Sequence, residues 1–340
     1  TSGFNNTAVG TTAMGGVVTG RDNTCIGFDS GDILTSGQFN TFVGSQSGEL
    51  TTTGNNNVGL GGNAMAANQT ASNNTAVGYE AMSATTTQGD NTAVGYQALK
   101  LSTTGYGCVA VGAYALDANQ TANYNTAVGF SALTTNTTGA NNTAVGRIAG
   151  QDNLTGNENV FVGEQAGWAN TTGSTNTIIG FRAGRGRTTG GSNVIIGSDA
   201  SYSVGTGSRC VAVGVNAGYN WTSAYNNTCI GYNTRTDEYN SYGATTIGYN
   251  GTGVGSETIT IVNGSNKTSV AIGSTNWAGT SDERLKENIQ SSTAGLSFIN
   301  DLRPVTFDWK MKKDIDTSLE AYELNSEEKY HKFNPTNNHG

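Results

Sequence analysis

A serine and a lysine that together could cut a peptide bond stand five residues apart, at Ser281 and Lys286. A serine hydroxyl needs a base to become a nucleophile, and a lysine that loses its water has a lowered pKa and can accept that proton. Residues five apart on one regular helix differ by about 140° in direction, so the pair can meet only where the backbone departs from a helix. The alternative is structural: Ser281 caps a helix whose first turn holds Asp282 and Glu283, and Lys286 is a solvated charge.

The segment that carries this pair differs in composition from the chain before it. Of the 42 charged residues, 19 lie between Asp282 and Lys332, and both prolines, Pro304 and Pro335, also follow residue 280. We therefore predict three parts: a repeat shaft over residues 1–252, a β neck over 253–280, and a small α+β segment over 281–340. Thr1 opens within the repeat without a methionine or a signal sequence, which indicates a fragment or a processed form.

The shaft is organised by glycine. Fifteen glycines recur at an unbroken spacing of 17 residues. So short a period, rich in turn residues and free of proline, indicates an all-β parallel β-solenoid, or β-roll, of about fifteen stacked coils. The glycines are Gly10, Gly27, Gly44, Gly61, Gly78, Gly95, Gly112, Gly129, Gly146, Gly163, Gly180, Gly197, Gly214, Gly231 and Gly248.

The residues around each glycine predict how a coil is filled, as in Asn91 to Gly95. A valine, isoleucine or leucine precedes the glycine in all fifteen coils, and Thr or Val stands two residues earlier, so we expect Thr92 and Val94 to face the lumen. Asn occupies the position four before the glycine in twelve coils, where stacked amides can hydrogen-bond from coil to coil. A small residue three after the glycine, such as Ala98, is expected to line a second inner edge. The threonine-rich runs that follow, such as residues 134–139, are expected to form exposed turns suited to recognition.

The residue at the centre of each expected strand is also small or apolar, although it points the other way. Strands that are apolar on both faces are buried on both. This second face predicts a partner, for which parallel copies of the same chain, three in number, are the preferred solution. The predicted trimer-interface residues are Ala8, Phe42, Ala76, Ala93, Ala110, Phe161, Ile178 and Ile195.

The register of glycines ends after Gly248. An alternating stretch, residues 257–262, is followed by Asn263-Gly264, a strong hairpin signal. We expect this neck to close the last open edge of the solenoid.

The repeat Asn-Thr-Ala-Val-Gly-x-x-Ala-Leu, found at residues 91–99 and 125–133, resembles the head repeats of trimeric autotransporter adhesins and related repeats of phage and viral tail fibres. The resemblance covers roughly residues 1–250. It implies a left-handed parallel β-roll, three chains together, that serves as a rigid adhesive head or stalk. The period of 17 is longer than is usual in those heads.

The C-terminal segment carries a second resemblance. Residues 281–289, Ser-Asp-Glu-Arg-Leu-Lys-Glu-Asn-Ile, and 302–309, Leu-Arg-Pro-Val-Thr-Phe-Asp-Trp, are similar to the start of the intramolecular chaperone auto-processing domain of phage tailspikes and fibres. That resemblance implies that the segment assembles three chains and then cuts itself off before the motif serine. Carried over, Ser281 is the nucleophile, Lys286 the base, and Thr280–Ser281 the scissile bond. Gly340 comes before the further helical stretch with which that domain usually continues.

Charge and side-chain types argue against several other functions. The formal charge of −8 and the scarcity of basic residues disfavour a nucleic-acid partner, and no apolar stretch is long enough to insert in a membrane. The basic cluster Arg182, Arg185 and Arg187 is expected to be solvated, and the four cysteines to be apolar fillers. His331 and His339 lack acidic or cysteine neighbours, so neither a metal nor a cofactor is expected.

We therefore expect a homotrimeric external appendage of a virion, a phage tail fibre above all. It would join other tail or baseplate proteins and present loops to a host-surface receptor, for which a glycan is one candidate. At most it would be a single-turnover serine self-cleaving endopeptidase. The alternative is a cell-surface trimeric adhesin. A polysaccharide-degrading tailspike is disfavoured because the acids of the repeats, such as Glu80 and Asp117, are scattered singly.

Overall fold

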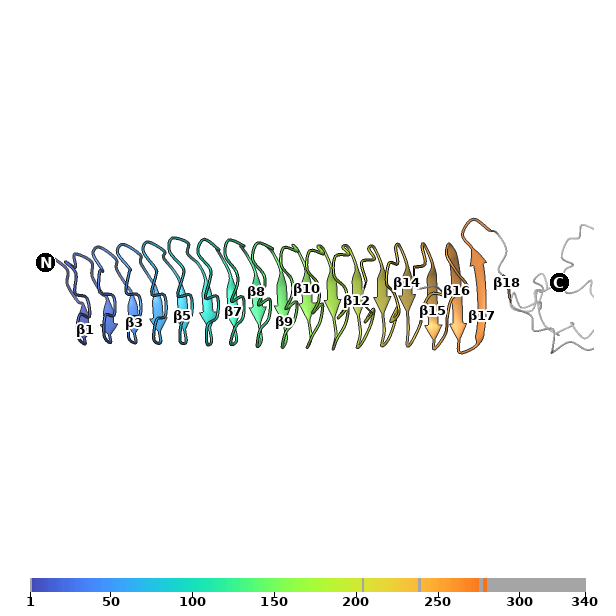
Figure 1. Cartoon of the computed structure of the whole chain (residues 1–340), viewed down its shortest axis with the longest axis horizontal. Helices are drawn as coiled ribbons and strands as arrows, with labels where there is room; N and C mark the ends of the chain where they lie inside the picture. Colours follow the sequence, from blue (N-terminus) through green and yellow to red (C-terminus); the bar gives the residue numbers. More distant parts are fainter. Residues whose placement is uncertain (1, 204, 238–239, 275–277, 280–340) are drawn as a thin grey trace, which may run out of the picture. The chain divides into compact units, whose positions relative to one another are not determined.

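The computed structural model describes residues 2–203, 205–237, 240–274 and 278–279 of the chain. Contacts divide the chain into two units, residues 1–280 and 281–340. The described part of the first unit is an all-β solenoid of about fifteen coils with no helix (Figure 1). It therefore also holds no helix that could cross a membrane. The expected solenoid is confirmed.

Fifteen short strands, one per coil, lie side by side in a single sheet, each paired in parallel with the next. The pairing joins residues that are 17 apart, as in Thr92 with Val109, so the sequence period is the coil. The strands are β1 Thr7–Val9, β2 Thr24–Ile26, β3 Thr41–Val43, β4 Val58–Leu60, β5 Thr75–Val77, β6 Thr92–Val94, β7 Val109–Val111, β8 Thr126–Val128, β9 Thr143–Val145, β10 Val160–Val162, β11 Thr177–Ile179, β12 Val194–Ile196, β13 Val211–Val213, β14 Thr228–Ile230 and β15 Thr245–Tyr249.

The glycine after each strand is required by backbone geometry. Gly95 has a φ of +140°, a conformation that L side chains rarely adopt. A Cβ atom at this position would lie 2.5 Å from the carbonyl oxygen of Gly112 in the next coil. The invariance of the glycine thus follows from its backbone angle and from the close approach of successive coils.

The strand centre, and not its flanks, points into the lumen. Ala93 is fully buried, whereas Val94 is 37% exposed, and the same pattern holds along the sheet. The prediction that Thr92 and Val94 face the lumen was therefore wrong. The predicted interface residues Phe42, Ala76, Ala93, Ala110, Phe161, Ile178 and Ile195 are buried inside their own chain, so that prediction was wrong as well; Ala8, in the first coil, is exposed.

Two positions of the coil fill the lumen together: the strand centre and the residue four after the glycine. In most coils one of them is large and the other small. Where the strand centre is alanine, the residue four after the glycine is large in five of seven coils, as with the buried pair Ala93 and Leu99; Ala144 and Ala212 go instead with Gly150 and Gly218. Where the centre is Phe161, that position is Gly167, whose added Cβ would lie 2.2 Å from the phenylalanine ring. Phe42 and Gly48 repeat the exchange, with a distance of 2.6 Å. The strand centre is therefore packed inside the lumen, both within its coil and across coils, since a Cβ at Gly150 of the preceding coil would also lie 2.4 Å from the Phe161 ring.

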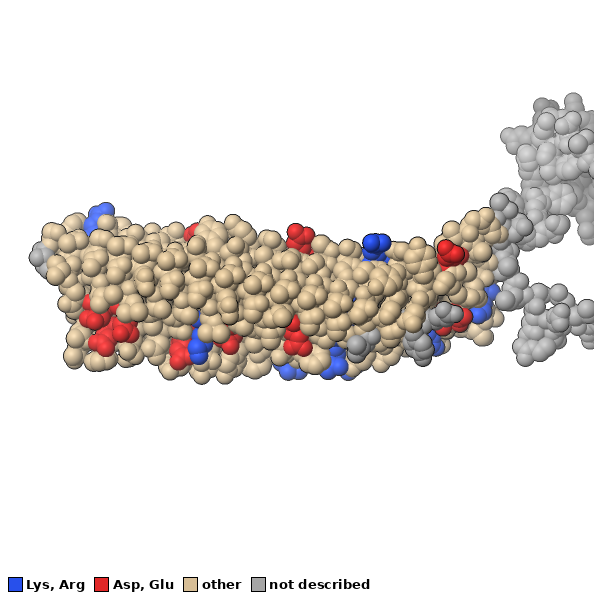
Figure 2. Space-filling model, turned by 45° about the horizontal axis from the view of Figure 1, so that its top comes forward, with Lys and Arg blue, Asp and Glu red and all other residues tan. Residues whose placement is uncertain are grey.

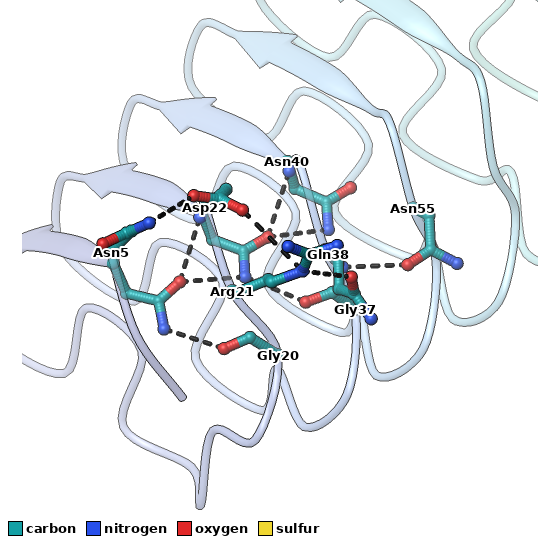
Figure 3. Close-up of polar contacts among 10 residues, drawn as sticks. Asn5, Gly20, Arg21, Asp22, Gly37, Gln38, Asn40 and Asn55 are labelled. Atoms are coloured by element: carbon teal, nitrogen blue, oxygen red, sulfur yellow. Dashed lines mark hydrogen bonds and ion pairs between the residues drawn. The ribbon is translucent and has the colours of Figure 1, made fainter. Parts of the chain in front are cut away.

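Charged side chains are few and scattered over the face of the rod shown in Figure 2. Beneath that surface, buried asparagine side chains are hydrogen-bonded from coil to coil. The Nδ2 atom of Asn40 donates to Oδ1 of Asn23 at 3.1 Å and to the carbonyl oxygen of Gly54 at 2.8 Å. The backbone N–H of Asn40 also donates to Oδ1 of Asn23, at 3.0 Å, so each amide serves both its neighbours. The expected asparagine ladder is confirmed (Figure 3).

A second asparagine ladder runs ten positions before the glycine and was not predicted. Asn136 donates to Asn119 at 3.2 Å, Asn153 to Asn136 at 3.0 Å, and Asn170 to Asn153 at 2.6 Å, all through their side-chain amides. Asn136 is buried although it lies in the run 134–139 that was expected to be an exposed turn, in which Thr138 is exposed. The turn is thus anchored by one inward amide.

The neck forms the predicted hairpin. Strand β16, Thr258–Asn263, pairs in parallel with β15 and continues the sheet. Strand β17, Asn266–Ala271, then turns back antiparallel to β16, and β18, Ala278–Gly279, pairs antiparallel with β17. The last edge of the parallel sheet is thus covered by β17, which runs in the opposite direction.

Candidate functional site

The outer face of the parallel strands is an uncharged surface that the sequence repeats in every coil. The residues one and three before each coil glycine are all Val, Ile, Leu or Thr, without a single charge. They are partly or well exposed because they point away from the lumen, as Ile196 at 37% and Ile230 at 39% show. A long exposed aliphatic strip of this kind marks an interaction surface. We refer to these two positions of β1–β15 as the outer strand face.

Aromatic side chains border this face along one edge. They stand directly after the coil glycine, where Tyr79 and Tyr96 stack with ring centroids 5.7 Å apart and Tyr232 and Tyr249 with centroids 5.4 Å apart. Tyr96 is 44% exposed and Tyr249 56%. Tyrosine supplies apolar area together with a hydroxyl that can remain hydrated, which suits the margin of an interface.

The surface next to Tyr96 is polar and holds a charged cluster. Lys100 pairs with Glu80 at 2.7 Å, and Gln97 donates to the same carboxylate at 2.7 Å. The hydrogen bond from Lys100 is the main cause that lowers the pKa of Glu80. Asp117 lies one coil from Lys100 at the equivalent position, and burial raises its pKa. Lys100 thus neutralises Glu80, and the charged side chains of this region lie outside the outer strand face.

The three arginines that were expected to be solvated contact other side chains of the shaft instead. Arg187 is buried in the coil, where its guanidinium donates to Oγ of Ser201 at 3.1 Å and to the carbonyl oxygen of Gly207. Burial lowers the pKa of this guanidinium. Arg182 forms an ion pair with Asp199 at 2.8 Å, and Arg185 lies between aromatic rings. The prediction of a solvated cluster was wrong.

The four cysteines behave as the predicted apolar fillers. Cys25, Cys108, Cys210 and Cys229 are all buried and unpaired. Burial raises the pKa of Cys25 and of Cys229 to about 12, so both remain thiols at neutral pH. Cys108 also stands four before its coil glycine, where most coils have a ladder asparagine. Its backbone N–H still donates to Oδ1 of Asn91 at 2.8 Å.

The predicted cleavage residues Thr280, Ser281 and Lys286 lie outside the described residues. The last described strand, β18, ends at Gly279, one residue before the predicted scissile bond. Its two residues pair with Thr268 and Ser269 of β17. The chain is therefore tied to the neck directly before the place where the resemblance puts the cut.

A protein-family model described as the chaperone of endosialidase matches residues 281–327. The match begins at Ser281, where the compact unit of residues 281–340 also begins. A search of curated proteins found no significant match to the chain. The β-solenoid and the chaperone match together fit a protein of the phage tailspike or tail-fibre type.

Proposed function

We propose that the chain is the subunit of a homotrimeric phage tail fibre, an external appendage of the virion that attaches the particle to its host. The observation that carries the proposal is the joint presence of a charge-free outer strand face in every coil and a chaperone-of-endosialidase match directly after the neck. A chaperone that assembles chains needs a surface for them to share, and the outer strand face supplies one.

The same reasoning replaces the interface predicted from sequence. The strand centres fill the lumen, so the surface for two further copies moves to the residues beside them, such as Val94 and Val111. Every coil repeats this surface, so parallel copies meet like with like along the whole shaft. The surfaces away from this face would carry the receptor-binding loops, and other tail proteins would hold the fibre on the particle.

For the C-terminal segment we propose a single self-cleavage that follows assembly. The Oγ atom of Ser281 attacks the carbonyl carbon of Thr280 while the amine of Lys286 takes the hydroxyl proton. As the C–N bond breaks, that proton passes to the departing amino group of Ser281, leaving an ester between the two residues. Water then hydrolyses the ester to a Thr280 carboxylate and the free serine hydroxyl.

Expression of the full chain tests both parts. Light scattering should give three times the chain mass, and intact-mass measurement should find a fragment ending at Thr280. Ser281→Ala and Lys286→Met should keep the chain whole, whereas Ser291→Ala, a serine outside the proposed pair, should not. A monomer would refute the assembly, and an intact wild-type chain would refute the cleavage while leaving the assembly untouched.

A further inference from the structure

One line of side chains on the shaft combines aromatic rings with a cation. Trp168, Arg185, Tyr202 and Tyr219 occupy the position five after the glycine in four successive coils. The Arg185 guanidinium carbon lies 4.7 Å from the Trp168 ring centroid and 5.6 Å from that of Tyr202. Tyr202 and Tyr219 stack with centroids 5.3 Å apart at 3°. These residues follow the coil glycines and do not belong to the outer strand face.

Arg185 is held in place without a carboxylate. Its Nε atom donates to Oε1 of Gln165 at 2.7 Å, and its Nη1 atom to the hydroxyl of Tyr202 at 3.0 Å. Within the part of the chain that the structure describes, Arg185 forms no ion pair and its Nη2 atom has no hydrogen-bond partner. Arg185 is a partly exposed residue, so a fixed donor group without an ion-pair partner among the described residues lies near the surface.

The surroundings reinforce this charge. The coil from residue 181 to 197 contains three arginines and no acidic residue, although the chain as a whole is acidic. Arg182 lies over the same Tyr202 ring, 5.3 Å from its centroid, and only this arginine is neutralised by Asp199. An anion near Tyr202 would thus meet one free guanidinium, one paired guanidinium and a phenolic hydroxyl.

We propose that Arg185, with Arg182 and Tyr202, binds an acidic group of an extended polysaccharide, either a carboxylate or a sulfate. A rigid guanidinium recognises such oxyanions through charge-assisted hydrogen bonds. The line of side chains runs along the shaft, so a linear polymer can contact several coils at once. The proposal rests on the proposed function for its setting, because a fibre that attaches to a cell meets such polymers at the cell surface.

The stacking of the line argues against a nucleic acid as the ligand. Bases bind exposed aromatic faces. Tyr202 has Tyr219 on one side and Arg185 on the other, and Arg185 also lies over Trp168, so these side chains already stack on one another. The ring edges, the Tyr202 hydroxyl and the Arg185 guanidinium are left for a ligand, and these groups suit an anionic, hydroxyl-rich polymer.

Calorimetric titration of the full chain tests the site with three probes. They are hexagalacturonate, a sulfated dextran oligosaccharide and the neutral maltohexaose. The two acidic probes report whether a carboxylate or a sulfate is preferred. We expect Arg185→Gln to weaken the preferred acidic probe about tenfold, and Tyr202→Phe, which removes the hydroxyl that positions the guanidinium, about threefold. The matched control is Arg147→Gln, an arginine of the same shaft that is already paired with Glu164 at 2.6 Å. It should bind like the wild type.

The proposal fails if neither acidic probe binds at millimolar concentration, if maltohexaose binds equally well, or if Arg185→Gln and Arg147→Gln behave alike. Tighter binding of single-stranded DNA than of either acidic probe would also overturn it. Light scattering on the same samples separates this result from the proposed function. A trimer that binds no acidic probe refutes only this site, whereas a monomer that binds one refutes only the assembly.

Discussion

The two sides of the same three-residue strand teach different lessons about this chain. On the inner side, volume matters, because in most coils a small residue such as Ala93 goes with a large residue four after the glycine, or the reverse. On the outer side, residues such as Val94 lie in register with similar residues of the neighbouring coils, such as Val77 and Val111, and remain partly exposed. The inner side therefore encodes the fold of one chain, and the outer side is available to encode its association.

The largest effect should come from placing the same charge on the two sides. Ala93→Lys buries an ammonium in a closed lumen without a partner, which costs several kcal/mol, so we expect little folded protein. Val94→Lys, one residue further, should keep the β circular dichroism spectrum and lose the trimer in light scattering. If both variants fold and assemble alike, the distinction between the sides is wrong.

The next effect tests volume matching. Phe161→Ala removes a buried ring and should lower the free energy of unfolding by about 3–5 kcal/mol. Adding Gly167→Leu should recover part of this loss, because Leu99 occupies the equivalent position with a φ of +54° against +58° at Gly167. Urea denaturation of the two variants and of Gly167→Leu alone gives the coupling. Additive losses would contradict the exchange of volume between the two positions.

A smaller loss of stability is expected in the asparagine ladder formed by the residues four before each coil glycine. Asn57→Ala removes an amide that donates to Asn40 at 3.1 Å and to the carbonyl oxygen of Ala71 at 2.8 Å, and should cost about 2–3 kcal/mol in urea denaturation. Asn57→Cys should cost less, because Cys108 occupies this position naturally and its Sγ atom lies 3.4 Å from the carbonyl oxygen of Ala122. Asn56→Gly, at the exposed neighbouring position, should lower the free energy of unfolding by less than about 1 kcal/mol, because the backbone φ of +57° at this residue suits glycine.

The smallest effect belongs to the surface charges. The pKa of Glu80 is lowered in the folded chain, so its pair with Lys100 stabilises the fold above the ordinary carboxyl pKa and loses that contribution as the pH falls through the folded pKa. Glu80→Gln should therefore shift the melting temperature slightly at pH 7 and less at pH 3. A larger shift at pH 3 would contradict the sign.

Much of the fold could be predicted from sequence because the period is itself a physical constraint. Gly95 and Asn91 recur since a φ near +140° and a coil-to-coil amide bond leave few alternatives, and Asn263-Gly264 marked the hairpin for the same local reason. The direction of the strand side chains could not be read from one coil, because both faces are apolar.

The missing information lay in comparing coils. In most coils a large residue at one of these two positions goes with a small one at the other, as Phe161 with Gly167 and Ala93 with Leu99, and this relation would have pointed to the lumen. The stacking of Arg185 could likewise be found by aligning its position with Trp168 and Tyr202. The proposed cleavage pair Ser281 and Lys286 stays a prediction, because it rests on residues that the structure does not describe.

Because the coils pair in parallel in one unbroken register, the length of the shaft can change by whole coils. Each coil offers the next a similar strand and the same glycine, and most coils the same amide, so inserting or deleting one coil leaves both neighbours with suitable backbone partners. Such a change alters the shaft by about 4.8 Å, the spacing of paired strands, and keeps the backbone pairing. The reach of the molecule can therefore evolve by duplication of a single repeat, while the antiparallel neck keeps its place at the end.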